Sequence, residues 1–291
     1  MSEIVYLNGS LIPRSQAKVS ALDYGFLYGF GLFETMRAYG GQVFRLESHL
    51  SRLARSAELL RLPVGTAELK DAVRDTIKAN LLSNARIRIT ISAGEGEMSP
   101  DPATCQKPTV LVLAERYQPY PQEVYQRGFR AVISSIRRNS QSPLSRLKSA
   151  NYLESLLARQ QARETGVDEA VCLNDKGLLA EASMSNIFLV SDGILRTPGE
   201  ESGILPGITR GVILELALKL GIKALKEDIR PSELFQAQEA FLTNSLIEVM
   251  PLTEIEGKPV ASGRPGALTR RLLAAYRKLA LSEGKGPLSQ R

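Results

Sequence analysis

The sequence predicts a mixed α/β fold divided into two domains, and three features lead to this prediction. Segments with the period-two alternation of strands alternate with segments whose apolar residues recur at helical spacing. The turn pairs Asn8-Gly9 and Asp192-Gly193 favour hairpins that join strands directly. Near the middle of the chain, residues 115–123 contain two prolines and show no periodicity. Local hairpins among mixed strands and helices argue against a Rossmann pattern.

The first part of the chain is expected to form a sheet with two helices. Residues 86–92 alternate with period two, as a half-buried strand does. Residues 46–62 carry leucine and alanine at helical spacing. The expected elements, in order, are strands at 4–7 and 11–12, a strand at 33–38 followed by a glycine pair and 43–44, helices at 46–62 and 67–80, and strands at 86–92 and 110–114.

The second part is expected to be the larger domain, with a linker before it. The domain prediction is a smaller N-terminal α/β domain at 1–117, a linker at 118–123 and a C-terminal domain at 124–291. The tail after residue 281 is rich in Gly, Pro and Ser and is expected to be disordered. The expected elements are strands at 131–136, 170–173, 187–190 and 240–243, and helices at 152–164, 209–220 and 268–281.

Composition excludes several classes of protein. The chain has 291 residues, of which 43% are hydrophobic, and no apolar run is long enough to span a bilayer. Its opening residues lack the pattern of a signal peptide, so a cytoplasmic location is expected. The net charge is +6, but the basic residues are scattered without interleaved aromatics, so no nucleic-acid partner is expected.

Few residues are available for metal or redox chemistry. Cys105 and Cys172 lie far apart and outside any CxxC pattern, so neither a disulfide framework nor a zinc site is expected. His49 is the single histidine, which excludes a His-rich metal site or a histidine dyad. Acid–base work therefore falls to Lys, Glu, Asp, Tyr or Thr, and we expect no metal.

The stretch from Glu181 to Arg210 carries the strongest chemical signal. It opens with an acid, continues with Asn186 before a strand, and closes with Gly207-Ile208-Thr209 at the start of a predicted helix. A helix N-terminus offers backbone N–H groups and a positive dipole to a phosphate. An acid upstream suits a ring nitrogen. The pattern indicates a site for a phosphorylated, nitrogen-containing ring.

Element by element, this stretch resembles the signature of the class IV (fold-type IV) pyridoxal-phosphate enzymes. That family contains branched-chain aminotransferases, D-amino-acid aminotransferases and 4-amino-4-deoxychorismate lyases. A second segment, Leu147-Lys148-Ser149-Ala150-Asn151, is similar to the family's lysine motif. The resemblance extends from Tyr6 to about Tyr276. It implies pyridoxal 5'-phosphate as cofactor, two α/β domains with the cofactor at their interface, and a homodimer.

The resemblance also implies a role for each matching residue. Lys148 would bond the cofactor covalently, and Glu181 would pair with the ring nitrogen and keep it protonated. Tyr152 would face the ring oxygen. His49, in the element that also contains Arg52, is interpreted as structural. The residues implied in phosphate binding are Arg52, Ile208, Thr209 and Ser245.

Three local features indicate which reaction to expect. Thr35 after Glu34, the segment 241–252 and the segment 135–148 are all similar to the aminodeoxychorismate lyases. The leading hypothesis is therefore a lyase that makes 4-aminobenzoate and pyruvate from 4-amino-4-deoxychorismate, as folate biosynthesis requires. Lys148 would remove the proton from C4 of the substrate ring, and Thr35 or Lys148 would help to protonate the departing enol. The substrate is a dianion, so Arg37, Arg86 or Arg88 could bind a carboxylate. Of these, Arg88 aligns with a substrate-side arginine of the branched-chain enzymes.

Two alternatives remain open. One is a class IV transaminase that uses branched-chain L-amino acids, D-amino acids or (R)-amines with a 2-oxo acid acceptor. The segment 92–98 lacks the arginine and histidine pair of the D-amino-acid enzymes, which speaks against strict D-amino-acid specificity. The other alternative is a basic nucleic-acid-binding or scaffold protein. The dispersed charge and the matching site residues argue against it.

Overall fold

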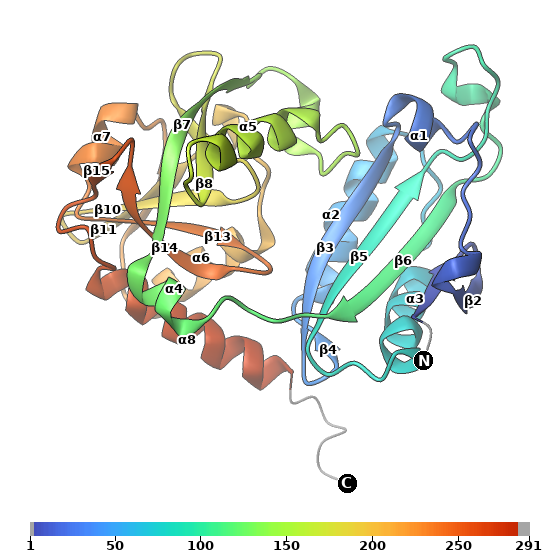
Figure 1. Ribbon diagram of the computed structural model, residues 1–291, viewed down its shortest axis with the longest axis horizontal. Coiled ribbons are helices and arrows are strands. Elements are labelled where there is room, and N and C mark those ends of the chain that lie inside the picture. Colours follow the sequence, from blue (N-terminus) through green and yellow to red (C-terminus); the bar gives the residue numbers. More distant parts are fainter. Residues whose placement is uncertain (1–2, 285–291) are drawn as a thin grey trace, which may run out of the picture. The chain divides into compact units, whose positions relative to one another are not determined.

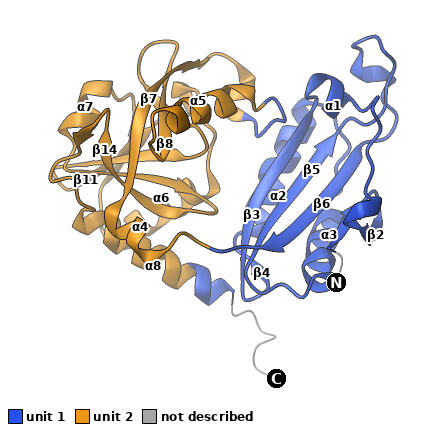
Figure 2. Ribbon diagram, viewed as in Figure 1, with its two compact units in different colours: residues 1–118, 147–151, 280–291 blue, residues 119–146, 152–279 orange. Residues whose placement is uncertain are grey.

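The computed structural model describes residues 3–284 and divides the chain into two compact units (Figures 1 and 2). Unit 1 comprises residues 1–118, 147–151 and 280–291, and unit 2 comprises residues 119–146 and 152–279. Each unit is built on its own sheet and carries helices, so the predicted mixed α/β class is confirmed. The linker at 118–123 stays a prediction. The tail at 285–291, predicted to be disordered, lies outside the described residues.

Unit 1 contains an antiparallel sheet in the order β2-β1-β6-β5-β3-β4. The predicted hairpin at Asn8-Gly9 joins its first two strands. The elements are β1 (Ile4–Leu7), β2 (Ser10–Pro13), α1 (Tyr24–Tyr28), β3 (Gly31–Tyr39), β4 (Gln42–Val43), α2 (Leu46–Leu59), α3 (Thr66–Ala79), β5 (Ala85–Ser92) and β6 (Thr109–Arg116), with short 3₁₀ turns at Arg14–Gln16 and Pro102–Thr104.

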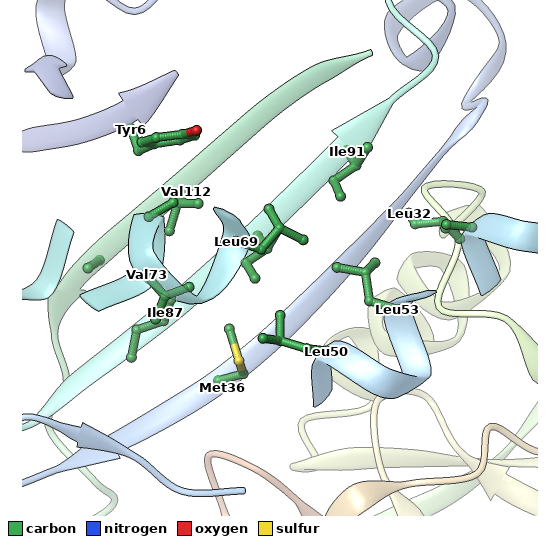
Figure 3. Packing of buried hydrophobic residues seen from close by; sticks show 14 of the residues in the cluster. Tyr6, Leu32, Met36, Leu50, Leu53, Leu69, Val73, Ile87, Ile91 and Val112 are labelled. Atoms are coloured by element: carbon green, nitrogen blue, oxygen red, sulfur yellow. The ribbon is translucent and has the colours of Figure 1, made fainter. Parts of the chain in front are cut away.

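Helices α2 and α3 cover one face of this sheet and form the core of unit 1 with it (Figure 3). Alternate strand residues such as Leu32, Met36 and Ile87 point toward helix residues such as Leu50 and Leu53, and all five are buried (Figure 3). Since successive side chains of a strand point to opposite faces, the intervening residues of β3 and β5 face away from the helices. That second face carries polar and charged side chains.

Unit 2 contains a larger, mixed sheet in the order β12-β11-β10-β13-β14-β7-β8-β9, with β15 paired to β14. Helix α5 packs on β7 and β8 through small residues, among them Ala158, Ala162 and Ala170. The elements are α4 (Gln122–Arg127), β7 (Phe129–Arg138), α5 (Leu153–Glu164), β8 (Glu169–Asn174), β9 (Leu179–Ala182), β10 (Asn186–Ser191), β11 (Ile194–Pro198), α6 (Ile208–Lys219), β12 (Ala224–Glu227), α7 (Pro231–Gln236), β13 (Glu239–Asn244), β14 (Glu248–Ile255), β15 (Lys258–Pro259) and α8 (Ala267–Glu283), with 3₁₀ turns at Pro143–Arg146 and Glu200–Ser202.

Every strand and helix expected from periodicity is present, with ends shifted by a few residues. The helix predicted at 46–62 ends at Leu59, since Arg61 adopts a positive φ of 54°. The elements that the pattern did not predict are mostly short, such as α1, α4 and α7. In residues 3–284, no helix combines the length and the apolar character needed to cross a bilayer.

Candidate active site

The segment around Lys148 lies beside β3 in unit 1. The backbone N–H of Phe33 donates to the carbonyl of Lys148 at 2.9 Å, and that of Ala150 donates to Gly31 at 2.8 Å. Leu32 and Ser149 form an antiparallel bridge. These bonds anchor Lys148 to the strand, and its Nζ lies 4.6 Å from the centroid of the Phe33 ring. A protonated amine over an aromatic face is attracted by the ring quadrupole.

Two further predicted residues share this face with Lys148. The guanidinium carbon of Arg88 lies 4.0 Å from the centroid of the same Phe33 ring, and its Nε donates to Thr90 Oγ1 at 3.2 Å. Thr35 is the direct partner of Arg88 in the pairing of β3 with β5. Directly opposite residues of an antiparallel pair point to the same face. The structure thus brings Lys148 and Arg88 to one ring and places Thr35 on the same face of the sheet.

Arg52 lies on the other side of β3, where α2 covers the sheet. Its Nε donates to Glu34 Oε1 at 2.8 Å and its Nη2 donates to Oε2 at 2.7 Å. His49 Nδ1 lies 2.7 Å from the same Oε2. All three side chains are buried. We call Glu34, His49 and Arg52 the buried acid cluster.

The charges of the buried acid cluster follow from these contacts. Burial by itself raises the pKa of Glu34, but Arg52 and His49 outweigh that effect and lower it to about 2. Burial lowers the pKa of His49 below its ordinary value of 6.5, against the opposing effect of Glu34, and the charges of Arg52 and Lys148 lower it further. Near neutral pH the cluster therefore holds an ionised Glu34, a cationic Arg52 and a neutral His49.

Unit 2 contains the predicted acid, Glu181, at the end of β9. Its Oε2 accepts hydrogen bonds from Asn186 Nδ2 and from the backbone N–H of Leu205, each at 3.2 Å. Arg138 Nη2 lies 3.6 Å from its other oxygen. A carboxylate with a cation and two hydrogen-bond donors around it is fixed in direction.

Tyr152 lies in the same surroundings, immediately before α5. Burial, followed by the negative charge of Glu181, raises the pKa of its hydroxyl to about 12. Arg138 donates to Ser155 Oγ of α5 at 2.8 Å and so connects this helix to the acid. Tyr152 therefore keeps its proton and presents a hydroxyl donor.

The predicted phosphate residues lie at the start of α6 and in the turn after β13. Ile208 is the first residue of α6, and Thr209 beside it is buried. Ser245 lies in the turn that Asn244 holds, because Asn244 Oδ1 accepts from the backbone N–H groups of Leu246 and Ile247, both at 2.9 Å. The helix N-terminus and this hydroxyl turn both belong to unit 2.

Two details of unit 2 fit a bound phosphorylated ring. Thr243 Oγ1 is buried and has no hydrogen-bond partner among the described residues. Thr243 pairs directly with Asn186, so both side chains lie on one face. The backbone of Gly207 lies so close to Asn186 that an added Cβ would be 1.9 Å from Asn186 Oδ1. A buried hydroxyl without a partner suits a ligand that supplies one, and the glycine lets the start of α6 lie against Asn186.

The comparison with known proteins decides the family. The family model of Amino-transferase class IV matches residues 31–255, a stretch that contains every predicted site residue. The chain belongs to the class IV aminotransferase family. It is accordingly an enzyme, and its cofactor is pyridoxal 5'-phosphate.

Its relatives in this family cover almost the whole chain. A Methanocaldococcus jannaschii protein provisionally named a branched-chain-amino-acid aminotransferase is 40% identical over 278 residues, which are 94% of this chain and 96% of the relative. An aminodeoxychorismate lyase of Bacillus subtilis is 34% identical over 279 residues, covering 94% of each chain. The solved branched-chain amino acid aminotransferase of Escherichia coli has a TM-score of 0.93 at 33% identity, covering 99% of this chain and 97% of that one.

Several residues of this class IV site were not assigned a role from the sequence. Glu34 orients Arg52, Arg138 and Asn186 surround Glu181, and Thr243 presents the partnerless hydroxyl. A weak signal existed for all four, since Glu34, Arg138, Asn186 and Thr243 lie inside the quoted motifs. Only the folded chain shows which atoms they contact.

Proposed function

We propose that this class IV enzyme transfers the amino group of branched-chain L-amino acids to a 2-oxo acid. The observation that carries the proposal is the face around Phe33, where an amine, a guanidinium and an aromatic ring meet. Lys148 can move a proton at the substrate Cα, Arg88 can bind a carboxylate, and the ring offers an apolar wall. Relatives named branched-chain aminotransferases, which match nearly the full chain, support this reading over the lyase.

The residues of both units have separate tasks in the proposal. When bound, pyridoxal 5'-phosphate supplies a protonated ring that withdraws electrons from the carbon bearing the substrate amine. Lys148 would hold the cofactor and would carry the proton at the substrate Cα. Glu181, fixed by Arg138 and Asn186, would pair with the ring nitrogen and keep it protonated, and Tyr152 would donate to the ring oxygen. The proposed phosphate contacts are Arg52, Ile208, Thr209 and Ser245.

A substrate panel tests this proposal. The cofactor-loaded enzyme, supplied with L-leucine, L-isoleucine or L-valine and 2-oxoglutarate, is expected to form glutamate. Replacing Lys148 by Ala is expected to lower the rate by about 10²–10⁴-fold, since the proton-transfer group is lost. Lys176→Ala, at an exposed position, is the matched control and is expected to behave like wild type. Turnover of only D-alanine or an (R)-amine would contradict the proposal.

A lyase is the second candidate, and Thr35 is the observation that favours it. Its hydroxyl shares the face with Lys148 and Arg88, opposite Arg88 in the strand pairing. A hydroxyl there can pass a proton to the enol of pyruvate as it leaves an amino-deoxychorismate ring. The similarity to the Bacillus subtilis lyase supports this candidate. Loss of pyruvate makes the ring of 4-aminobenzoate aromatic, which drives the elimination.

The variant Thr35→Val separates the two candidates. If the enzyme is a lyase, freshly made 4-amino-4-deoxychorismate gives fluorescent 4-aminobenzoate and pyruvate. The variant is then expected to lose about 10²-fold or more of that rate. Transamination of L-leucine is expected to change little, because valine keeps the volume of threonine. Undiminished lyase turnover in the variant would remove Thr35 from the mechanism.

Two broader expectations belong to the same proposal. The family resemblance implies a homodimer, and a cytoplasmic location is the second expectation. Sedimentation of the purified enzyme tests the first, because a monomeric mass in an active sample would contradict it. Fractionation of the source cells tests the second.

A further inference from the structure

An arginine can bind a phosphate without the buried carboxylate and histidine that accompany Arg52 in the buried acid cluster. The side chains of Glu34, His49 and Arg52 are 1%, 2% and 6% exposed. Burying a carboxylate in this way is costly unless it is paired and hydrogen-bonded. Here both oxygens of Glu34 accept from Arg52, and one of them also contacts His49. The carboxylate is therefore fully engaged with its two partners on α2.

The contact between Glu34 and Arg52 is of the two-point kind. Nε and Nη2 of one guanidinium edge each reach a different oxygen of one carboxylate, at 2.8 and 2.7 Å. Two parallel bonds of this sort fix the plane of the guanidinium as well as its position. A single bond would leave the plane free to rotate. His49 restrains the carboxylate in turn, because its Nδ1 lies 2.7 Å from Oε2.

The position of Glu34 on β3 connects this cluster to the proposed substrate face. Its neighbours in sequence, Phe33 and Thr35, point to the face that carries Lys148, whereas Glu34 points to α2. One strand thus positions groups on both of its sides. A shift of β3 would move the Phe33 ring and the anchor of Arg52 together.

We propose that Glu34 is a positioning residue, which holds the guanidinium of Arg52 in a fixed plane for the phosphate of the cofactor, with His49 restraining Glu34. The proposal rests on the phosphate role proposed for Arg52. A long arginine side chain loses rotamer freedom when it binds a ligand, and this loss weakens binding. A guanidinium already fixed by Glu34 has lost that freedom in the folded apoenzyme, so phosphate binding costs less.

The variant Glu34→Gln tests the proposal, because it keeps the shape of the side chain and removes the charge and one acceptor. Equilibrium dialysis measures the Kd of the apoenzyme for pyridoxal 5'-phosphate and for pyridoxal, which lacks the phosphate. We expect the Kd for the phosphorylated ligand to rise about tenfold or more, and that for pyridoxal to change less than about twofold. Glu47→Gln, at an exposed position of the same helix, is the matched control. An equal loss for both ligands, or no loss for either, would overturn the proposal.

A double-variant cycle separates the role of Glu34 from that of Arg52. In an Arg52→Gln background, Glu34→Gln is expected to weaken binding of the phosphorylated ligand no further, since Glu34 acts through Arg52. Full additivity of the two losses would contradict the positioning role. If Arg52→Gln by itself left the Kd unchanged, the phosphate role of Arg52 would fail. Loss in Arg52→Gln together with normal binding in Glu34→Gln would reject only the positioning role.

A second variant keeps the test decisive if Glu34→Gln does not fold. Glu34→Asp retains the charge but withdraws the carboxylate by one methylene, so it cannot reach both guanidinium nitrogens as before. A smaller, still phosphate-selective loss of affinity is expected. Thermal unfolding of each apoenzyme shows that the folded state is present during dialysis. Wild-type affinity in a folded Glu34→Asp protein would count against two-point positioning.

Discussion

His49 shows how much a single buried side chain determines in this protein. It is the one histidine of the chain, and it lies buried against Glu34, with the charges of Arg52 and Lys148 acting on it. Burial and those two cations favour its neutral form. A neutral His49 restrains the carboxylate without adding a second positive charge beside Arg52. A structural role for His49 stays a prediction, and its burial against Glu34 supports it.

The pH dependence of stability is expected to reveal the lowered pKa of His49. The pKa of His49 is lowered in the folded state, so below its ordinary value of 6.5 the unfolded chain takes up a proton that the folded chain refuses. Stability therefore falls as pH decreases from about 6.5, by at most about 1.4 kcal/mol per pH unit. Denaturant unfolding of wild type and His49→Asn at pH 5.5–7.5 measures this. The difference in unfolding free energy between them is expected to shrink as pH falls, and parallel curves would contradict the assignment.

Glu34 influences the stability of the fold over a different range of pH. Its pKa in the folded state is about 2, against an ordinary value of 4.5. Its contribution to stability is therefore fully present above about pH 4.5 and is lost as pH falls toward 2. The two residues of one hydrogen bond thus influence stability in separate ranges of pH.

At the scale of elements, the start of α6 is a tightly constrained part of unit 2. Gly207 precedes the helix, and its backbone approaches Asn186, which in turn donates to Glu181 and to the carbonyl of Leu205. Asn186 therefore connects the acid to the turn that begins the helix. A displacement at this turn would reach both the proposed phosphate contacts and the proposed partner of the ring nitrogen.

Two glycines of this region are expected to respond in opposite ways to an added methyl group. Gly207→Ala places a Cβ 1.9 Å from Asn186 Oδ1, so Asn186 or the turn must move. It is expected to destabilise the fold by about 1–3 kcal/mol and to weaken cofactor binding. Gly211, one turn into α6, has nothing within 4 Å of an added Cβ. Gly211→Ala is therefore the matched control and is expected to stabilise the helix by about 0.5–1 kcal/mol. Equal unfolding midpoints for the two variants would refute this account.

At the scale of the whole molecule, the proposed site residues are distributed over both units. Lys148, Thr35, Arg88 and Arg52 belong to unit 1, whereas Glu181, Tyr152 and the hydroxyl and backbone groups for phosphate belong to unit 2. The short segment 147–151 belongs to unit 1 although unit 2 precedes and follows it in the chain. Its hydrogen bonds to β3 explain this assignment.

The whole-chain comparisons also change the expected reaction. Short motifs around Thr35 and Ser245 favoured the lyase. Most of the similar relatives and solved structures, however, are named branched-chain aminotransferases. The two reactions differ in how a few side chains meet the substrate, while the cofactor site is shared. The assays with L-leucine and with 4-amino-4-deoxychorismate therefore decide between them, and the family assignment stands in either case.

The sequence by itself determined the fold class, the succession of long strands and helices, the family and the cofactor. These follow from periodicity and from motifs in which the chemistry requires particular residues close together along the chain. Segments 46–62 and 86–92 were assigned correctly because their apolar faces repeat over several turns or pleats. Short helices such as α1 and α7 were not predicted, since five or six residues carry too little periodicity to distinguish them from turns.

Only the tertiary structure decided how the site residues are supported. Glu34 and Arg52 are joined by two hydrogen bonds across 18 positions of sequence, and Asn186 and Gly207 come together from separate elements. Likewise, Lys148 reaches the Phe33 ring because residues 147–151 bond to β3. Contacts of this kind depend on which strand lies beside which helix and on the direction of each side chain. Local periodicity contains no information about either. The hydrogen bonds between Glu34 and Arg52 could therefore be identified only in the folded chain.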